Sequence, residues 1–314
     1  MRMNVWSALA VSSFIVVFII FQGCGQPQTS GKTSQGKVET SQQAQNSSET
    51  TQKESQPIQI KGSDTMVNLG KAWAESFMVK YPEANLAVTG GGSGTGIASL
   101  IQGTAQVVQS SRAIEPVEIM EAQKNGITPK EFLVGYDGIA VIVNPGNTVQ
   151  SLTIQQLADI FTGKITNWNM VGGNDGKVVI LSREVNSGTH VYFKEHVLNG
   201  GNTKGTVEFA PDALMMSSSQ AIVDEVASNP NAVGYIGMGY ISVNVKVVPI
   251  AKDSSANPVT PNVENVKSNS YPISRPLYIY TKGEPEGMVK QFVDFVLSSE
   301  GQEIVKKDGF VPFQ

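Results

Sequence analysis

The sequence predicts an α/β fold of two lobes, in which short strands alternate with helices. Apolar runs rich in Val and Ile alternate with stretches whose apolar residues recur at helical spacing, as is typical of α/β proteins. Two apolar runs, at 134–144 and 276–281, are flanked by turn residues and are interpreted as strands that carry the chain between the lobes. Three runs of Gly, Ser and Thr each stand directly before a helical pattern. A ligand between two such lobes would lie at the carboxyl ends of strands and face helix N-termini.

Residues 1–24 have the pattern of an export signal. Arg2 precedes an apolar run at 5–21, and Cys24, the only cysteine of the chain, follows shortly after it. A cysteine at this position resembles the lipidated first residue of a bacterial lipoprotein, although Phe-Gln at 21–22 replaces the usual leucine and small residue. An uncleaved membrane anchor is the alternative. Either outcome tethers the rest of the chain outside the cytoplasm.

Residues 25–57 are expected to form a disordered tether. This stretch consists mainly of Gln, Ser, Thr, Lys and Glu and has almost no large apolar residue, so it cannot form a core. The folded part therefore begins near Ile58.

The first lobe opens with a strand at 58–60 that ends at the first Gly/Ser run. Apolar residues then recur every four positions from Leu69 to Tyr81, which predicts a helix with one buried face that Pro82 terminates. The pattern continues with a strand at 85–89, a helix that starts at Ile97 and a strand at 107–110.

The second lobe is expected between the two crossing strands. Its predicted elements are a helix at 154–161, a strand at 178–182, a helix from the third run to 198 and a strand at 233–236. A last helix at 288–307 carries apolar residues on one face and is expected to pack back on the first lobe. The predicted boundaries place lobe 1 at 58–138 and 276–314, and lobe 2 at 139–275.

The composition argues against a nucleic-acid partner. The 314 residues carry a net charge of -4, and the 23 basic residues are spread along the chain without a basic block. The chain is 40% hydrophobic and 16% charged, which fits a globular protein large enough for two lobes. An anionic ligand would have to be held by local dipoles and one or two arginines.

The three Gly/Ser/Thr runs, at 62–65, 90–96 and 186–189, together suggest an anion site. The first turn of a helix has backbone N–H groups without intrahelical partners and lies at the positive end of the helix dipole. Glycine lets the backbone approach closely, and Ser and Thr add hydroxyl donors. Any one run alone reads as an ordinary helix cap, and the repetition favours a binding site.

Other chemistries find little support in the sequence. His190 and His196 are six positions apart, so they do not share a helix face as metal ligands at i and i+4 would, and neither a metal nor a cofactor is expected. The chain has no Gly-x-Ser-x-Gly elbow, and its glycine run fits neither the dinucleotide-binding pattern nor the P-loop. The sequence is therefore not expected to encode an enzyme.

Several segments resemble the PstS-type substrate-binding proteins of phosphate ABC importers. These segments are Gly92-Ser93-Gly94, Arg183 with Ser187-Gly188-Thr189, the stretch at 152–168, and the closing stretch at 301–313. The resemblance covers the chain from Ile58 to its end. It implies a two-lobed periplasmic-binding-protein fold of type II with a hinge, and a phosphate buried between the lobes.

The resemblance also implies which residues bind phosphate. The implied and candidate binding residues are Thr65, Met66, Ser93, Ser111, Arg112, Asp137, Arg183, Ser187, Gly188 and Thr189. Arg183 is expected to fork onto two oxygens of the anion.

One position departs from the family pattern. Well-known members carry an aspartate that accepts the proton of hydrogen phosphate where this chain has Ser111-Arg112. Asp137 is the preferred substitute and Asp64 the second candidate. Arg112 is expected to help keep Asp137 ionised, with Glu115 as an alternative partner of this arginine.

The expected function is that of a lipid-anchored, monomeric, extracytoplasmic protein. It would capture inorganic phosphate by closure of its lobes and present it to the membrane permease of an ABC importer. Another tetrahedral oxyanion, such as sulfate, molybdate or tungstate, is the nearest alternative ligand. A secreted phosphatase or an adhesive surface protein on the same scaffold is the alternative from another class.

Overall fold

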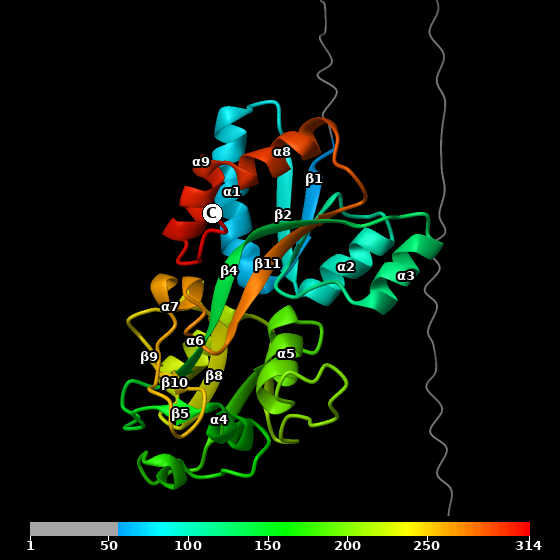
Figure 1. The fold of residues 1–314 in the computed structure, drawn as a ribbon. Helices are drawn as coiled ribbons and strands as arrows, with labels where there is room; N and C mark the ends of the chain where they lie inside the picture. Colours follow the sequence, from blue (N-terminus) through cyan, green and yellow to red (C-terminus); the bar gives the residue numbers. More distant parts are fainter. Residues whose placement is uncertain (1–55) are drawn as a thin grey trace, which may run out of the picture. The chain divides into compact units, whose positions relative to one another are not determined.

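The computed structural model describes residues 56–314 and confirms the predicted α/β class (Figure 1). Its main element is a nine-stranded sheet with the order β2-β1-β3-β11-β4-β8-β6-β7, in which β9 pairs with β4. No helix in this part of the chain is long and apolar enough to cross a membrane. Cys24, the predicted signal and the predicted tether up to residue 55 lie outside the described residues.

Lobe 1 is the half of the sheet that contains β1, with its helices. Strands β1, β2 and β3 are parallel, and β11 joins β3 in the antiparallel direction. Helices α1, α8 and α9 share one buried cluster, and α2 and α3 share another, so helices cover both faces of the sheet. The elements are β1 Ile58–Gly62, α1 Val67–Lys80, β2 Leu86–Gly91, α2 Ser93–Ile101, β3 Val107–Ser110, α3 Pro116–Lys124, β11 Ser274–Thr281, α8 Gly287–Leu297 and α9 Ser299–Lys307.

Helix α1 shows why these residues fold as they do. Leu69, Trp73 and Phe77 follow one another at four-residue spacing, and all three side chains are fully buried. The ring of Phe77 packs edge-on against Phe292 of α8, with the ring centroids 5.4 Å apart. The indole N–H of Trp73 donates to the carbonyl of Gly301 in α9 at 2.8 Å. The C-terminal helices therefore pack on lobe 1, as the sequence predicts.

Lobe 2 is the half of the sheet that contains β8, β6 and β7, which are parallel to one another where they pair. The rings of Phe193 and Tyr235 stack, and Phe161 packs edge-on against both, on the face covered by α4 and α5, whereas α6 covers the other face. The elements are β5 Leu152–Thr153, α4 Ile154–Phe161, β6 Val179–Arg183, α5 Gly188–Phe193, β7 Leu214–Met216, α6 Ser219–Ser228, β8 Ala232–Gly237, β9 Lys246–Val247, β10 Ile250–Ala251 and α7 Val263–Lys267.

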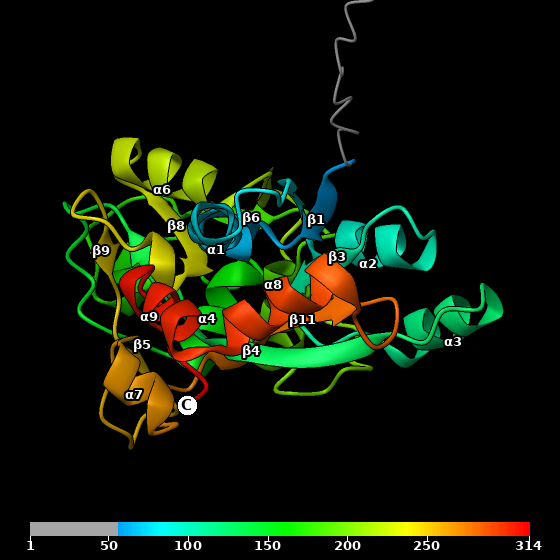
Figure 2. The same cartoon turned by 90° about the horizontal axis from the view of Figure 1, so that it is seen from above.

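Strand β4, Lys130–Val143, is one long strand beside β11 (Figure 2) and pairs with strands of both halves of the sheet. Residues 130–138 pair with β11 of lobe 1, and residues 139–143 pair with β8 of lobe 2. All side chains from 139 to 143 are fully buried, because helices cover both faces of the sheet there. Between Gly138 and Ile139 the pairing of this strand passes from β11 to β8.

The predicted helix at 288–307 is wrong in one respect, because the structure contains two helices there. Ser298 has an extended backbone with ψ 165°, which ends α8, and its hydroxyl accepts from the N–H of Gly301 at the start of α9. A side chain at Gly301 would collide with the carbonyl of Phe295. The apolar periodicity continues across this break, which is why the sequence reads as one helix.

Candidate functional site

The three Gly/Ser/Thr runs meet where the two lobes touch. The first run forms the loop after β1, and its residues Asp64–Met66 make a 3-10 turn before α1. The second run opens α2 at Ser93, and the third opens α5 at Gly188. All three follow the carboxyl ends of parallel strands, which is where open α/β sheets bind ligands.

Five hydroxyl groups form a buried cluster at this meeting point, which we call the hydroxyl cluster. Its members are Ser63, Thr65, Ser93 and Ser111 of lobe 1 and Thr189 of lobe 2, none more than 2% exposed. The Ser63 hydroxyl donates to Ser111 Oγ at 2.9 Å, and the Ser111 N–H donates to Ser93 Oγ at 3.1 Å. Thr65 Oγ1 and Thr189 Oγ1 share a hydrogen bond of 2.7 Å across the lobes. Donors and acceptors from both lobes thus converge in a site shielded from water.

Gly188 closes the cluster from lobe 2. A Cβ at this position would lie 2.8 Å from Ser111 Oγ and closer still to Ser93 Oγ, a separation that atoms in folded proteins do not adopt. Only glycine therefore lets the start of α5 approach these two hydroxyls. The structure brings together five of the predicted residues in this cluster, namely Thr65, Ser93, Ser111, Gly188 and Thr189.

Arg275 lies within the hydroxyl cluster, although it is not among the binding residues predicted from the sequence. This side chain is 1% exposed. Its Nη2 donates to Thr189 Oγ1 at 2.9 Å and to Thr65 Oγ1 at 3.3 Å, and its Nη1 donates to the carbonyl of Ser111 at 3.0 Å. It stands one position before the predicted crossing strand at 276–281 and outside the three runs, so no motif marks it. Its place at the start of a strand that crosses between the lobes was the one feature of the sequence that could have indicated a role in the site.

Asp137 is the ionic partner of Arg275, and both side chains are fully buried. One carboxylate oxygen accepts from Nη2 of Arg275 at 2.8 Å and from Nε at 3.0 Å, and the other accepts from the N–H of Met238 at 2.9 Å. Burial raises the pKa of the Asp137 carboxyl, and the charge and hydrogen bonds of Arg275 act in the opposite direction. The prediction that Arg112 helps keep Asp137 ionised is wrong, because Arg275 occupies that place.

Arg112 pairs within its own lobe. Its Nη2 lies 2.6 Å from Oε1 of Glu118, and its Nη1 lies 3.7 Å from Oε1 of Glu115, the alternative partner that the sequence analysis named. Glu118 is placed for this contact because it stands in the first turn of α3, where it also takes part in a capping box. Arg112 Nε is buried and has no hydrogen-bond partner among the described residues, so one donor of this arginine is not engaged.

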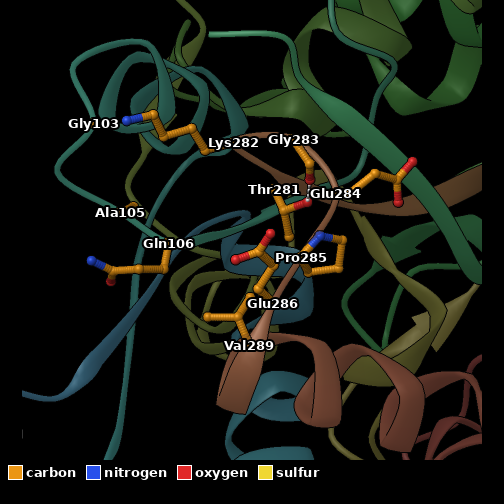
Figure 3. A pocket seen from close by; sticks show the side chains of 10 residues that line it. All are labelled: Gly103, Ala105, Gln106, Thr281, Lys282, Gly283, Glu284, Pro285, Glu286 and Val289. Carbon is orange, nitrogen blue, oxygen red and sulfur yellow. Dashed lines mark hydrogen bonds between the residues drawn. The ribbon is translucent and has the colours of Figure 1, made fainter.

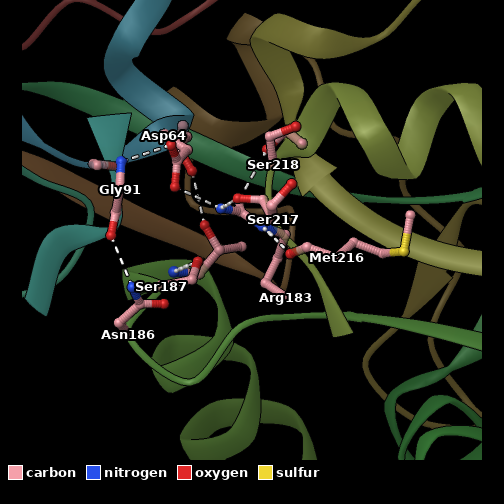
Figure 4. Close-up of polar contacts among 12 residues, drawn as sticks. Asp64, Gly91, Arg183, Asn186, Ser187, Met216, Ser217 and Ser218 are labelled. Carbon is pink, nitrogen blue, oxygen red and sulfur yellow. Dashed lines mark hydrogen bonds and ion pairs between the residues drawn. The ribbon is translucent and has the colours of Figure 1, made fainter. Parts of the chain in front are cut away.

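Arg183 is buried, and all three of its nitrogens are engaged (Figure 4). Nη2 donates to a carboxylate oxygen of Asp64 at 2.8 Å, Nη1 donates to the Ser219 hydroxyl at 3.3 Å, and Nε and Nη2 donate to backbone carbonyls at 216–217. Burial lowers the pKa of Arg183, and the charge of Asp64 opposes this. Asp64 also accepts from the N–H of Gly91 at 2.9 Å. To bind two oxygens of an anion, Arg183 would have to give up some of these hydrogen bonds.

The groups of Met66 and Ser187 that would bind an anion already form hydrogen bonds within the protein. The Met66 N–H donates to the carbonyl of Ser63 at 3.1 Å within the 3-10 turn. The Ser187 hydroxyl accepts from the N–H groups of Thr189 and His190 at 3.2 and 3.4 Å, so it caps α5. Both residues adjoin the hydroxyl cluster and shape its loops.

The histidines do not form a metal site. His190 is buried against Phe209, and His196 stacks on Tyr192 with the ring centroids 3.7 Å apart. Burial lowers the pKa of both histidines. Within residues 56–314, no group of three or more His, Cys, Asp or Glu side chains could hold a metal ion.

A cavity of about 420 Å³ lies in lobe 1 beside the start of α8 (Figure 3). Its lining includes the charged residues Lys282, Glu284 and Glu286, and none of the predicted binding residues takes part. It is therefore a surface hollow separate from the hydroxyl cluster.

Comparison with known proteins places the chain in a family. The model of the PBP superfamily domain matches residues 39–300. The Phosphate-binding protein PstS of Pseudomonas aeruginosa is 35% identical over 268 residues, which cover 80% of this chain and 81% of that protein. The protein of the same name from Bacillus subtilis is 33% identical over 265 residues, covering 83% and 82%.

Solved structures agree with this assignment. A putative phosphate ABC transporter substrate-binding protein with bound phosphate, from Clostridium perfringens, is 35% identical with a TM-score of 0.73 and covers 82% of this chain and 100% of that one. An ABC-type phosphate transport receptor from Vibrio cholerae is 31% identical with a TM-score of 0.65, covering 81% and 99%. The predicted two-lobed fold of type II is confirmed by these matches. With its three runs joined in one buried cluster, the chain belongs to the PstS-type family of phosphate-binding proteins within the PBP superfamily.

Proposed function

We propose that this chain captures inorganic phosphate between its two lobes and delivers it to the permease of an ABC importer. The observation that carries the proposal is the buried set of hydroxyls from both lobes around Arg275. Hydroxyls and an arginine donate hydrogen bonds that suit the oxygens of a tetrahedral anion. The Clostridium perfringens relative, which holds phosphate, supports this ligand.

Closure of the two lobes would complete the binding of phosphate. Phosphate enters while the lobes are apart, and closure then brings Thr189 and Gly188 onto Ser93 and Ser111. We propose that the anion takes the place of the bond between the two threonine hydroxyls. Arg112 Nε, Arg183 and the backbone of Met66 are further candidate donors.

Calorimetry on phosphate-stripped protein in chelator tests the proposal. The expected result is one phosphate site per chain that needs no divalent ion. Sulfate, molybdate and tungstate are expected to compete poorly, and phosphate esters are expected to remain uncleaved. Absence of phosphate binding, or tighter binding of another oxyanion, would overturn the proposed ligand, whereas turnover of an ester would point to a phosphatase.

Replacement of Asp137 by asparagine is expected to lower the affinity for phosphate and to reduce the preference of the site for phosphate over sulfate. Near neutral pH phosphate keeps a proton that a carboxylate can accept, whereas sulfate presents only acceptors. An amide can turn its NH₂ group toward an unprotonated oxygen and still accept from Arg275. One hydrogen bond to a charged group corresponds to roughly 1.5–3 kcal/mol, or about ten- to a hundred-fold in affinity.

Competition binding of both anions to Asp137→Asn and Asp64→Asn checks this prediction. Asp64 is the matched control because it is the second candidate and pairs with the other buried arginine. If Asp137→Asn kept its full selectivity for phosphate over sulfate and Asp64→Asn lost it, Asp64 would be the carboxylate that accepts the phosphate proton.

We further propose that Cys24 is lipidated and that residues 25–57 tether the lobes to the outer face of the membrane. The proposed lobes are residues 58–138 with 276–314, and residues 139–275, and the protein acts as a monomer. The spacing of Cys24 after the apolar run supports the anchor. Mass spectrometry of the native N-terminus should find diacylglyceryl on this cysteine, and an unmodified, uncleaved terminus would favour the membrane-helix alternative.

A further inference from the structure

A second contact between the lobes lies beside the hydroxyl cluster and involves Asn186, the residue that precedes the cap of α5. Its side-chain Nδ2 donates to the carbonyl of Gly91 at 2.8 Å and to Thr95 Oγ1 at 3.2 Å. Its backbone carbonyl accepts from the N–H of Gly94 at 3.0 Å. One residue of lobe 2 thus makes three hydrogen bonds to the glycine run of lobe 1.

The glycine run is shaped to receive this residue. A Cβ at Gly92 would lie 2.6 Å from the carbonyl oxygen of Asn186, and a Cβ at Gly94 would lie 3.3 Å from it. Gly92 also has a φ of 93°, which side chains rarely adopt. The run at 90–96 therefore does more than open α2, because its missing side chains make room for the other lobe.

Gly91 connects this contact to the ion pair between the lobes (Figure 4). Its carbonyl accepts from Asn186, and its N–H donates to Asp64, whose other carboxylate oxygen accepts from Arg183. Arg183 at the end of β6 and Asn186 in the loop that follows it thus contact two neighbouring stretches of lobe 1, which the bond between Gly91 and Asp64 joins. Asn186 is partly exposed, whereas the hydroxyl cluster is buried.

We propose that Asn186 and the glycine run form a latch that sets how fast the bound anion leaves, without touching the anion. The inference rests on the proposed phosphate function. The latch bonds join residues of opposite lobes, so they exist only when the lobes are together. They stabilise the closed form and leave the open form, in which the anion enters, unaffected. The dissociation rate should therefore carry nearly the whole effect of weakening the latch.

Stopped-flow release of phosphate into an excess of a fluorescent phosphate sensor tests the latch. In Asn186→Ala the dissociation rate is expected to rise about ten-fold, which corresponds to about 1.4 kcal/mol, while the association rate stays within about two-fold of the wild type. Asn169→Ala is the matched control, since Asn169 is an exposed asparagine of lobe 2 that bonds Asp175 of the same lobe. Its rates should equal those of the wild type.

The partner side of the latch gives a second variant. Thr95→Val removes the acceptor of Asn186 Nδ2 at nearly constant volume, and Thr95 is exposed, so folding should be retained. Its dissociation rate is expected to rise less than that of Asn186→Ala. In the double variant the two effects should not multiply, because both remove the same bond.

Two outcomes separate the latch from the phosphate function. Wild-type dissociation rates in both Asn186→Ala and Thr95→Val, with phosphate still bound, would refute the latch and leave the proposed function standing. If the wild type bound no phosphate, the proposed function would fail and the latch with it, because the latch acts on the release of a bound anion.

Discussion

Replacing Arg275 by methionine is expected to lower phosphate affinity by at least about a hundred-fold and to destabilise the protein by about 3–5 kcal/mol. The change removes the bonds to Thr65, Thr189 and Ser111 and leaves the carboxylate of Asp137 buried without its cationic partner. Removing one member of a buried ion pair costs more than removing both, because the remaining charge is uncompensated. Urea denaturation and calorimetry measure the two effects.

The double variant Arg275→Met with Asp137→Asn is the control for the uncompensated charge. It should recover much of the lost stability but not the phosphate affinity, since the donors of Arg275 stay absent. Equal stability of the single and double variants would show that the carboxyl of Asp137 carries no penalty in the folded protein that lacks Arg275.

Acid should partly restore the stability of the single variant. Arg275 is the group that holds down the pKa of Asp137, so its loss raises the folded-state pKa further above the unfolded value. A carboxyl whose pKa is higher in the folded than in the unfolded state lowers the free energy of unfolding. This loss is complete at a pH above the folded-state pKa, and it disappears as the pH falls to the unfolded-state pKa. Lowering the pH from about 7 to about 5 should therefore narrow the stability gap between Arg275→Met and the wild type.

Replacing Gly188 by alanine is expected to lower phosphate affinity by about a hundred-fold while leaving the thermal stability nearly unchanged. The new methyl group would lie between the hydroxyls of Ser93 and Ser111, so the lobes could not close fully. Overpacking costs about 1–3 kcal/mol, and here it acts only on the closed form. Gly188 is the first residue of α5, where alanine is at least as good a helix former as glycine.

Gly146→Ala is the matched control for the methyl group added in Gly188→Ala. Gly146 lies in lobe 2, and an added Cβ would approach only Asn144 Oδ1, at 3.3 Å. Its affinity should equal that of the wild type when both are measured by calorimetry. Wild-type affinity in Gly188→Ala would show that lobe closure does not bring α5 onto these hydroxyls.

Much of the fold follows from local patterns. The four-residue spacing from Leu69 to Phe77 predicts α1, and the apolar run at 139–143 predicts a strand. The Ser187-Gly188-Thr189 run predicts the capped start of α5. Periodicity and capping act between residues a few positions apart, so the sequence alone decides them. The break at Ser298 was missed because apolar spacing continues through it.

The partners of the charged groups were decided by the tertiary structure. Arg275 and Asp137 are 138 positions apart, Arg183 and Asp64 are 119 apart, and Asn186 and Gly91 are 95 apart. Nothing in the spacing of such residues shows which strand ends will meet. Arg112 found its partner locally, because α3 places Glu118 six positions away. A buried charge must be paired wherever the fold leaves it, and the sheet order, not the order of the chain, determines which partner is within reach.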